Sequence, residues 1–272
     1  MIGKIDCFLP CSNPNDLKET IEMLRKSKTI RQINLLVDSD FKVAERADDC
    51  TTIVVDNLLS TDTMRKVSEN AEADYVLLAL KSTPLVLGQH ALDRLLRVAT
   101  DTHAALVYSD YHAVVDGKRE QHPVIDYQMG SLRDDFDFGS LLFIRADLLH
   151  EYVATCGKEG GHQFAFAGLY DLRLFLSRKG ELFHINEYLY TAQEFDTRKS
   201  GERQFDYVNP RNREVQIEME KAVTLHLEAV GAHIDTHDYE APNFNREPFN
   251  CEASVVIPVY NRERTIADAV KS

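Results

Sequence analysis

Long hydrophobic runs are missing from this 272-residue sequence, and it contains no tryptophan. No apolar segment approaches the roughly 20 residues that a membrane-spanning helix requires. The first residues, Met1 to Asp6, lack the apolar core of a secretory signal peptide. These absences predict a cytoplasmic protein without a transmembrane helix.

Cysteine is scarce and scattered. The five cysteines are an odd number, and none of them forms a Cys-x-x-Cys pair or a zinc-binding spacing. A disulfide framework and a structural zinc site are therefore not expected, and reduced thiols fit a cytosolic setting. Only Cys7 and Cys11 lie close together in the sequence, and we interpret both as small packing residues rather than as a redox pair.

Positive charge is also in short supply. The sequence has 31 lysine and arginine residues against 44 aspartate and glutamate residues, which gives a formal net charge of −13. An acidic protein of this kind is not expected to bind nucleic acid non-specifically, because that binding requires a basic surface. The same charge disfavours broad adhesion to anionic lipid, so peripheral membrane association would depend on a local basic patch.

The hydrophobic pattern alternates between predicted strands and predicted helices. The central feature is Tyr75 to Leu80, six apolar residues in a row, which is typical of a strand buried on both faces. Further strands are predicted at residues 4–10, 32–37, 52–55 and 104–108, with helices opening at Asn13 and Ser60 and another near residues 92–99. This order predicts an α/β fold with a mostly parallel central sheet flanked by helices.

The second half of the chain is less regular. We expect a hairpin around Asp116-Gly117, a strand at residues 139–144, helices at 146–152 and 170–178, and short strands at 182–185 and 188–192. Residues 196–212 are polar and are expected to be mobile. An amphipathic helix is predicted over residues 212–230, with Gly231 ending it.

The start of the sequence is echoed near its end. Ser254 to Asn261 repeats the pattern of Asp6 to Asn13, in which a buried strand is followed by Pro-x-x-Asn and an amphipathic helix. A lone strand and part of a helix cannot bury their own apolar surface. We therefore interpret residues 1–235 as one domain, residues 236–252 as a linker, and residues 253–272 as the truncated start of a second domain of the same type.

Val255 to Arg262, Val-Val-Ile-Pro-Val-Tyr-Asn-Arg, resembles the opening of glycosyltransferase family 2, which has the GT-A fold. The first 235 residues resemble the same family more weakly along their whole length, through Leu36 to Asp40, Ala71 to Tyr75 and Asp171 to Leu176. The resemblance implies transfer of a sugar from a nucleotide-sugar donor to a hydroxyl of a glycan or lipid-linked acceptor, as in polysaccharide synthesis. It also implies a divalent cation such as Mg²⁺ or Mn²⁺.

The resemblance places a donor crevice beyond the central strand, where ligands collect in open α/β sheets. It implies an acceptor side formed by residues 134–140 and 165–171. The expected nucleotide-sugar-binding residues are Pro10, Ser12, Asn13, Asp38, Ser39, Arg65, Lys81, Ser82 and Asp110.

Two positions depart from the family pattern. The family's Asp-x-Asp metal motif is replaced by Leu80-Lys81-Ser82, which contains no carboxylate. The family's Glu-Asp pair, whose Asp is the general base, is replaced by Gly168-Leu169, and Asp171 is the carboxylate that follows. A general base must approach within about 3 Å of the hydroxyl proton. The resemblance therefore offers Asp171 only as a displaced candidate and assigns no metal ligand.

Each candidate also has an ordinary structural interpretation. Lys81 is either a cation for the diphosphate in place of the metal or a lysine at a strand end. Asp38 and Asp110 are either ligand-binding or turn residues, and Arg65 is either a diphosphate ligand or a solvated helix arginine. The acidic run Asp134, Asp135 and Asp137 is either a metal or acceptor site or a solvated loop.

Two functions remain open at this point. In the first, the chain is a glycosyltransferase. In the second, residues 1–235 are a non-catalytic GT-A module that binds or scaffolds for an active domain beginning near Ala253. The missing carboxylates motivate the second, since a fold does not by itself carry a function.

Overall fold

The computed structural model describes residues 3–41, 50–157, 161–193, 213–235, 255–257 and 263–271. The chain divides into two compact units, Met1–His233 and Ile234–Ser272. The first contains the sheet, and in the second the described residues include helix α7, Glu263–Lys271. No helix in the described part of the chain is long and apolar enough to cross a membrane.

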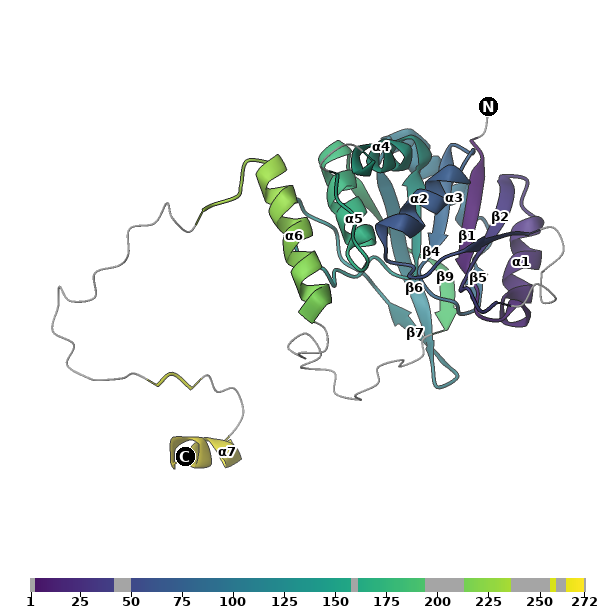
Figure 1. Ribbon diagram of the computed structural model, residues 1–272. Helices are drawn as coiled ribbons and strands as arrows, with labels where there is room; N and C mark the ends of the chain where they lie inside the picture. Colours follow the sequence, from purple (N-terminus) through teal and green to yellow (C-terminus); the bar gives the residue numbers. More distant parts are fainter. Residues whose placement is uncertain are drawn as a thin grey trace. The chain divides into compact units, whose positions relative to one another are not determined.

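A nine-stranded sheet forms the centre of the first unit (Figure 1). Strands β3, β2, β1 and β4 run parallel to one another. Strand β8 is antiparallel to both β4 and β6, whereas β9 is parallel to β6. The predicted α/β class with a helix-flanked central sheet is confirmed. In sheet order the strands are β3 (Thr51–Val54), β2 (Ile30–Val37), β1 (Ile5–Pro10), β4 (Tyr75–Ala79), β8 (Leu141–Arg145), β6 (Leu106–Val115), β9 (Leu182–Gln193) and β5 (Leu85–Leu87), with β7 (Lys118–His122) paired to β6.

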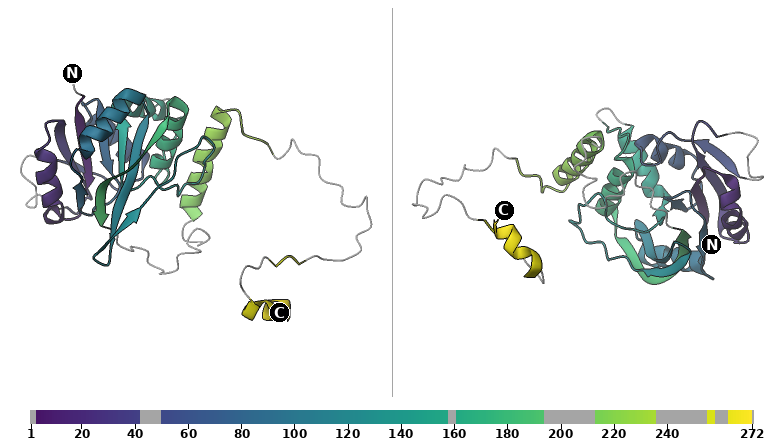
Figure 2. Two further views of the ribbon diagram at one scale, coloured as in Figure 1. Left: turned by 180° about the vertical axis from the view of Figure 1, so that it is seen from behind. Right: turned by 90° about the horizontal axis from the view of Figure 1, so that it is seen from below.

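Helices cover both faces of the sheet. Helices α2, α4 and α5 pack against one another on one face, while α3 lies on the opposite face, which is turned toward the viewer on the left of Figure 2. Helix α6 lies along α5 (Figure 1). The bounds are Lys18–Arg25 for α1, Thr61–Glu69 for α2, Ala91–Thr102 for α3, Ala146–Cys156 for α4, Gly168–Lys179 for α5 and Arg213–Ala229 for α6.

The predicted helix ends depend on local side-chain chemistry. The Asn13 side chain accepts a hydrogen bond from the Asn15 N–H at the start of the short 3₁₀ helix Pro14–Leu17, which leads into α1. The Ser60 side chain caps α2 through the Thr63 N–H. Gly231, with φ of 70°, follows the end of α6 in the left-handed conformation that glycine adopts most readily. The sequence predicts these helix ends because each depends on residues that are neighbours in the chain.

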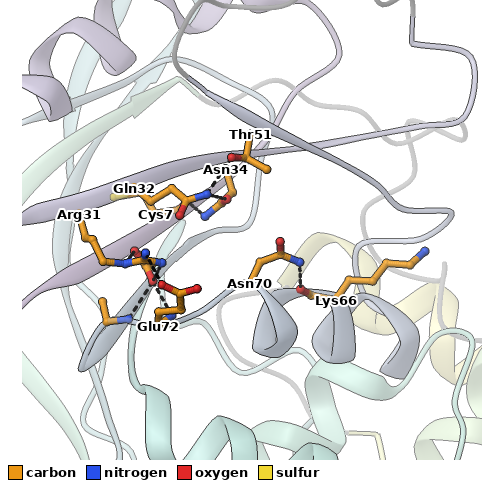
Figure 3. A network of polar contacts seen from close by, with 10 residues as sticks. Cys7, Arg31, Gln32, Asn34, Thr51, Lys66, Asn70 and Glu72 are labelled. Atoms are coloured by element: carbon orange, nitrogen blue, oxygen red, sulfur yellow. Dashed lines mark hydrogen bonds and ion pairs between the residues drawn. The ribbon is translucent and has the colours of Figure 1, made fainter.

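A half-buried ion pair between Arg31 and Asp6 joins β2 to β1 (Figure 3). The Asp6 side chain is fully buried, and Arg31 donates to both of its oxygens, from Nε at 2.8 Å and from Nη2 at 2.7 Å. Asp6 also accepts hydrogen bonds from the backbone N–H groups of Glu72 and Ala73. This network fixes the segment before β4 against β1. Cys7, next along β1, is fully buried, and burial raises the pKa of its thiol, consistent with a packing role.

The structure differs from expectation in four places. Strand β6 runs without a break into the β6–β7 hairpin, and β9 is one strand where two short ones were predicted. Strand β5 was not predicted, because three residues carry too little periodicity. Val255 to Ile257 do not form the predicted buried strand, and Val255 is 84% exposed. A strand requires a partner, and within the described residues these three pair with none. The expected mobility of residues 196–212 and the linker at 236–252 lie outside the described residues.

Candidate functional site

A crevice of about 380 Å³ lies at the carboxyl ends of the parallel strands β1, β2 and β4, beside the end of β3. This is the position where an open α/β sheet collects ligands. We call it the strand-end crevice. Its lining residues are Pro10, Cys11, Ser12, Leu36, Val37, Asp38, Val55, Asp56, Leu58, Leu80, Lys81, Ser82 and Thr83.

Five of the predicted donor-site residues line the strand-end crevice, namely Pro10, Ser12, Asp38, Lys81 and Ser82. Asp38 also closes a local turn, because its carboxylate accepts a hydrogen bond from the Asp40 N–H at 3.1 Å. Asp38 therefore has the turn role, and its ligand-binding role stays a prediction.

Four predicted donor-site residues do not line the strand-end crevice, namely Asn13, Ser39, Arg65 and Asp110. Arg65 pairs with Asp62 on its own helix and donates to Gln163 at 2.7 Å. Asp110 is buried within the fold, where it accepts from the Val124 N–H at 2.8 Å and contacts the His184 ring at 2.9 Å. Asn13 serves as the cap described above.

The crevice lining offers two carboxylates, those of Asp38 and Asp56, to a divalent cation. Mg²⁺ and Mn²⁺ favour an octahedral set of oxygen ligands, so these two side chains do not complete a metal site by themselves. Within the described ranges, no three His, Cys, Asp or Glu side chains are grouped so that they could hold a metal ion.

A second cavity has a volume of about 410 Å³. Leu80, at the tip of the central strand β4, lines both this cavity and the strand-end crevice. We call the second one the Arg173 cavity after its buried arginine. It brings together most of the predicted acceptor side, residues 134–139 with Phe166, Leu169 and Tyr170. The other lining residues are Leu59, Leu80, Leu106, Leu142, Ile144, Leu172, Arg173, Leu176 and Met219.

Arg173 is the charged residue that α5 contributes to this cavity, whose lining also includes the carboxylates of Asp134, Asp135 and Asp137. The residue is only 6% exposed, and burial lowers the pKa of its guanidinium. Its Nη1 donates to the Arg133 carbonyl at 2.8 Å, and the guanidinium lies 4.6 Å from the centre of the Tyr170 ring. Within the part of the chain that is described, its Nε and Nη2 atoms have no hydrogen-bond partner.

The start of α5 explains the departure from the family's Glu-Asp pair. A Cβ atom at Gly168 would lie 2.1 Å from the Thr61 backbone nitrogen, so no side chain fits there without moving α2. Leu169, the next residue, lines the Arg173 cavity with an apolar side chain. The position of the expected general base therefore presents no carboxylate to the cavity.

Asp171 does not replace the missing carboxylate in this arrangement, because its side chain lines neither cavity. It is buried between α4 and α5 and accepts a hydrogen bond from the Tyr152 hydroxyl at 3.0 Å. Burial raises its pKa above the usual range for an aspartate. Its catalytic role, which the sequence offered as a displaced alternative, stays a prediction that this geometry does not support.

Sequence reasoning missed three residues of interest. Asp56 and Arg173 line the two cavities. Asp56 could have been found because it follows a strand. Arg173 could have been found because it shares the i, i+3, i+4, i+7 stripe of Leu169, Leu172 and Leu176. No local signal marks Glu218 of α6, whose carboxylate accepts from three backbone N–H groups, those of Ala165 to Ala167, at the start of α5.

No protein-family model and no curated protein matches this sequence. Solved structures similar to this chain include two crystal structures of S. aureus TarS residues 1–349, one of them in complex with UDP. In each case the identity is 11%, the TM-score is 0.51, and the match covers 82% of this chain. This chain spans 65% of the TarS chain in both. The comparison shows that the chain has a glycosyltransferase-like α/β fold.

Proposed function

We propose that this chain binds a nucleotide-sugar in the strand-end crevice and transfers the sugar to a hydroxyl of a glycan or lipid-linked acceptor in the Arg173 cavity. The observation that carries the proposal is that Leu80, at the tip of β4, lines both cavities. A donor in one cavity and an acceptor in the other would meet there, and such positioning supplies much of the rate enhancement in a two-substrate reaction. The UDP bound to TarS, a structure of similar fold, supports the choice of donor.

The crevice offers suitable chemistry for a nucleoside diphosphate. Lys81 supplies a compact positive charge for the diphosphate, the role that a metal plays in the resembled family. Asp38 supplies hydrogen-bond acceptors for the ribose or base. Thr83 adds a hydroxyl whose oxygen is buried without a partner among the described residues. A ligand hydroxyl or phosphate oxygen would satisfy it.

A base for the acceptor hydroxyl must come from the Arg173 cavity. Asp135 is paired with Arg133, and this partner lowers the pKa of the carboxyl, which makes it a weaker base. Asp137 accepts from the Gly139 N–H and contacts His122. Asp134 has no ion-pair partner within the described ranges and lines the same cavity. We therefore assign proton removal to Asp134.

A second function, donor binding without transfer, is favoured by one specific observation. Leu169 places an apolar side chain where the resembled family has its base. The crowding of Gly168 against Thr61 leaves no room for the carboxylate that precedes the base in that family. In that case the chain would be a binding or scaffolding module for an active domain.

The test is calorimetric titration of the full chain with UDP, UDP-N-acetylglucosamine and GDP-mannose, with EDTA and again with Mg²⁺. We expect saturable binding of one nucleotide class in EDTA. Lys81→Ala and Asp38→Ala should each weaken binding about tenfold, the typical effect of losing one charge-assisted hydrogen bond. Lys118→Ala, an exposed residue on the distant β7 hairpin, should leave it unchanged.

Release of the nucleoside diphosphate in the presence of acceptor glycans then separates the two functions. Release that falls in Asp134→Asn supports transfer, whereas donor binding without release supports the binding module. Absence of binding to every nucleotide at millimolar concentration contradicts both.

A further inference from the structure

The Arg173 guanidinium has a hydrogen-bond partner on one side and none among the described residues on the other. Nη1 is held by the Arg133 carbonyl, while Nε and Nη2 are buried without a partner among the described residues. The Tyr170 hydroxyl near the guanidinium donates to the Leu132 carbonyl. Buried polar groups in folded proteins nearly always have partners, so the open pair requires an explanation.

The two open atoms are the pair that other arginines in this chain use to hold a carboxylate. Arg31 binds the two Asp6 oxygens through Nε and Nη2, and Arg133 binds the two Asp135 oxygens in the same way, at 2.8 and 2.7 Å. Arg145 does so with Asp147. The fork formed by Nε and Nη2 matches the spacing of two carboxylate oxygens. Arg173 therefore presents the same binding element with no carboxylate from the described residues on it.

The surroundings of this fork favour an apolar ligand with a single negative charge. The wall around Arg173 is built from leucine, isoleucine and phenylalanine side chains, including Phe138, which lies 5.7 Å from the guanidinium. Tyr127, 6.0 Å away, adds a buried hydroxyl without a partner among the described residues. Asp134, Asp135 and Asp137 line the same cavity, and their negative charge would repel a doubly charged phosphate more strongly than a singly charged carboxylate.

We propose that the Arg173 cavity binds a small apolar molecule ending in a carboxylate, which Nε and Nη2 of Arg173 hold in a bidentate contact. The apolar part of the ligand fills the leucine and phenylalanine wall. The cavity, about 410 Å³, lies within the size range of small-molecule sites. This proposal does not rest on sugar transfer or on the strand-end crevice.

The test uses three probes with the same apolar body: 4-phenylbutyrate, 4-phenylbutyramide and 4-phenylbutyl phosphate. Each is titrated into the full chain by calorimetry, and methyl NMR shifts of Leu172 and Leu176 locate the site. We expect 4-phenylbutyrate to bind about tenfold more tightly than the neutral amide, because only the acid makes a charge-assisted bidentate contact. The phosphate should bind more weakly than the acid.

Arg173→Gln should bring the acid-to-amide affinity ratio to about one, since glutamine has no guanidinium fork. Arg178→Gln, on the same helix but outside the cavity lining, should keep the wild-type ratio. Equal binding of acid and amide to the wild type, a ratio that survives in Arg173→Gln, or no saturable binding of either probe would each overturn the proposal. Tighter binding of the phosphate would overturn the assignment to a carboxylate. If Arg173→Gln does not fold, the wild-type ratio and the methyl shifts decide the outcome alone.

Discussion

Two buried aspartates of this fold have very different partners. Asp6 is matched by the Arg31 fork and by two backbone N–H groups, as Figure 3 shows for Arg31 and Glu72. Asp171 is 7% exposed and has the Tyr152 hydroxyl as its hydrogen-bond donor. A buried carboxylate without a paired cation is costly in its ionised form. Asp171 is therefore a position where the charged state opposes folding.

We expect Asp171→Asn to raise the thermal unfolding midpoint at pH 7. Burial raises the pKa of Asp171 in the folded state, so its stabilising contribution is present below the unfolded pKa, about 3.9, and is lost as pH rises through the folded pKa. Asparagine stays neutral and still accepts from Tyr152. The gain should therefore disappear near pH 3 to 4, where the wild-type residue is protonated. The measurement is the thermal unfolding midpoint of the wild type and of Asp171→Asn between pH 3 and pH 7.

Asp101→Asn, an exposed position on α3, is the matched control and should show no such pH-dependent gain. A lower midpoint for Asp171→Asn at pH 7 would contradict the prediction. Loss of sugar transfer in a fully folded Asp171→Asn would return the catalytic role to this residue.

At the scale of elements, α6 is attached to the rest of the first unit by a few contacts. Glu218 accepts from three N–H groups at the start of α5, where the helix dipole favours a negative charge. One turn on, Ala222 is buried against Phe164, Tyr170 and Leu174. His226 is also buried, and its Nδ1 lies 2.7 Å from Nη1 of Arg178. Because α6 also contributes Met219 to the Arg173 cavity, its attachment helps to shape that site.

We expect α6 to loosen in mild acid. Burial, with the neighbouring positive charge of Arg178, lowers the pKa of His226 below its usual value. Its stabilising contribution is therefore present above the unfolded pKa, about 6.5, and is lost as pH falls through the folded pKa. Hydrogen-exchange protection of α6 amides, corrected for intrinsic rates, should fall between pH 7 and pH 5 while α3 stays protected.

His226→Gln is the corresponding variant, since glutamine can accept from Arg178 but does not titrate. Its α6 protection should vary little over the same pH range. Equal acid sensitivity of α6 in His226→Gln and in the wild type would assign the effect to another group.

At the scale of the whole molecule, residues 1–233 contain the sheet and its helices as one compact unit. Our proposed boundary at residue 235 implies that this unit needs nothing beyond it to fold. A chain ending at residue 235 should therefore unfold in one cooperative transition, with the same calorimetric midpoint as the full chain. A chain ending at residue 212, which lacks α6, should melt at a lower temperature because Phe164 and Tyr170 lose the cover of Ala222. A lower melting midpoint for the chain that ends at residue 235 than for the full chain would place the domain boundary beyond residue 235.

The local pattern of the sequence determined the α/β class, the buried strand Tyr75 to Leu80, the caps at Asn13 and Ser60, and the position of Lys81 and Ser82 at a strand tip. Each depends on residues that are neighbours in the chain, so periodicity and turn chemistry are enough to predict it. Packing between distant segments decided the rest. Asp110 contacts His184, and Gly168 packs against the Thr61 backbone. Nε and Nη2 of Arg173 are buried without a hydrogen-bond partner among the described residues. Such contacts join residues tens of positions apart, and only the folded chain brings their atoms within reach of one another.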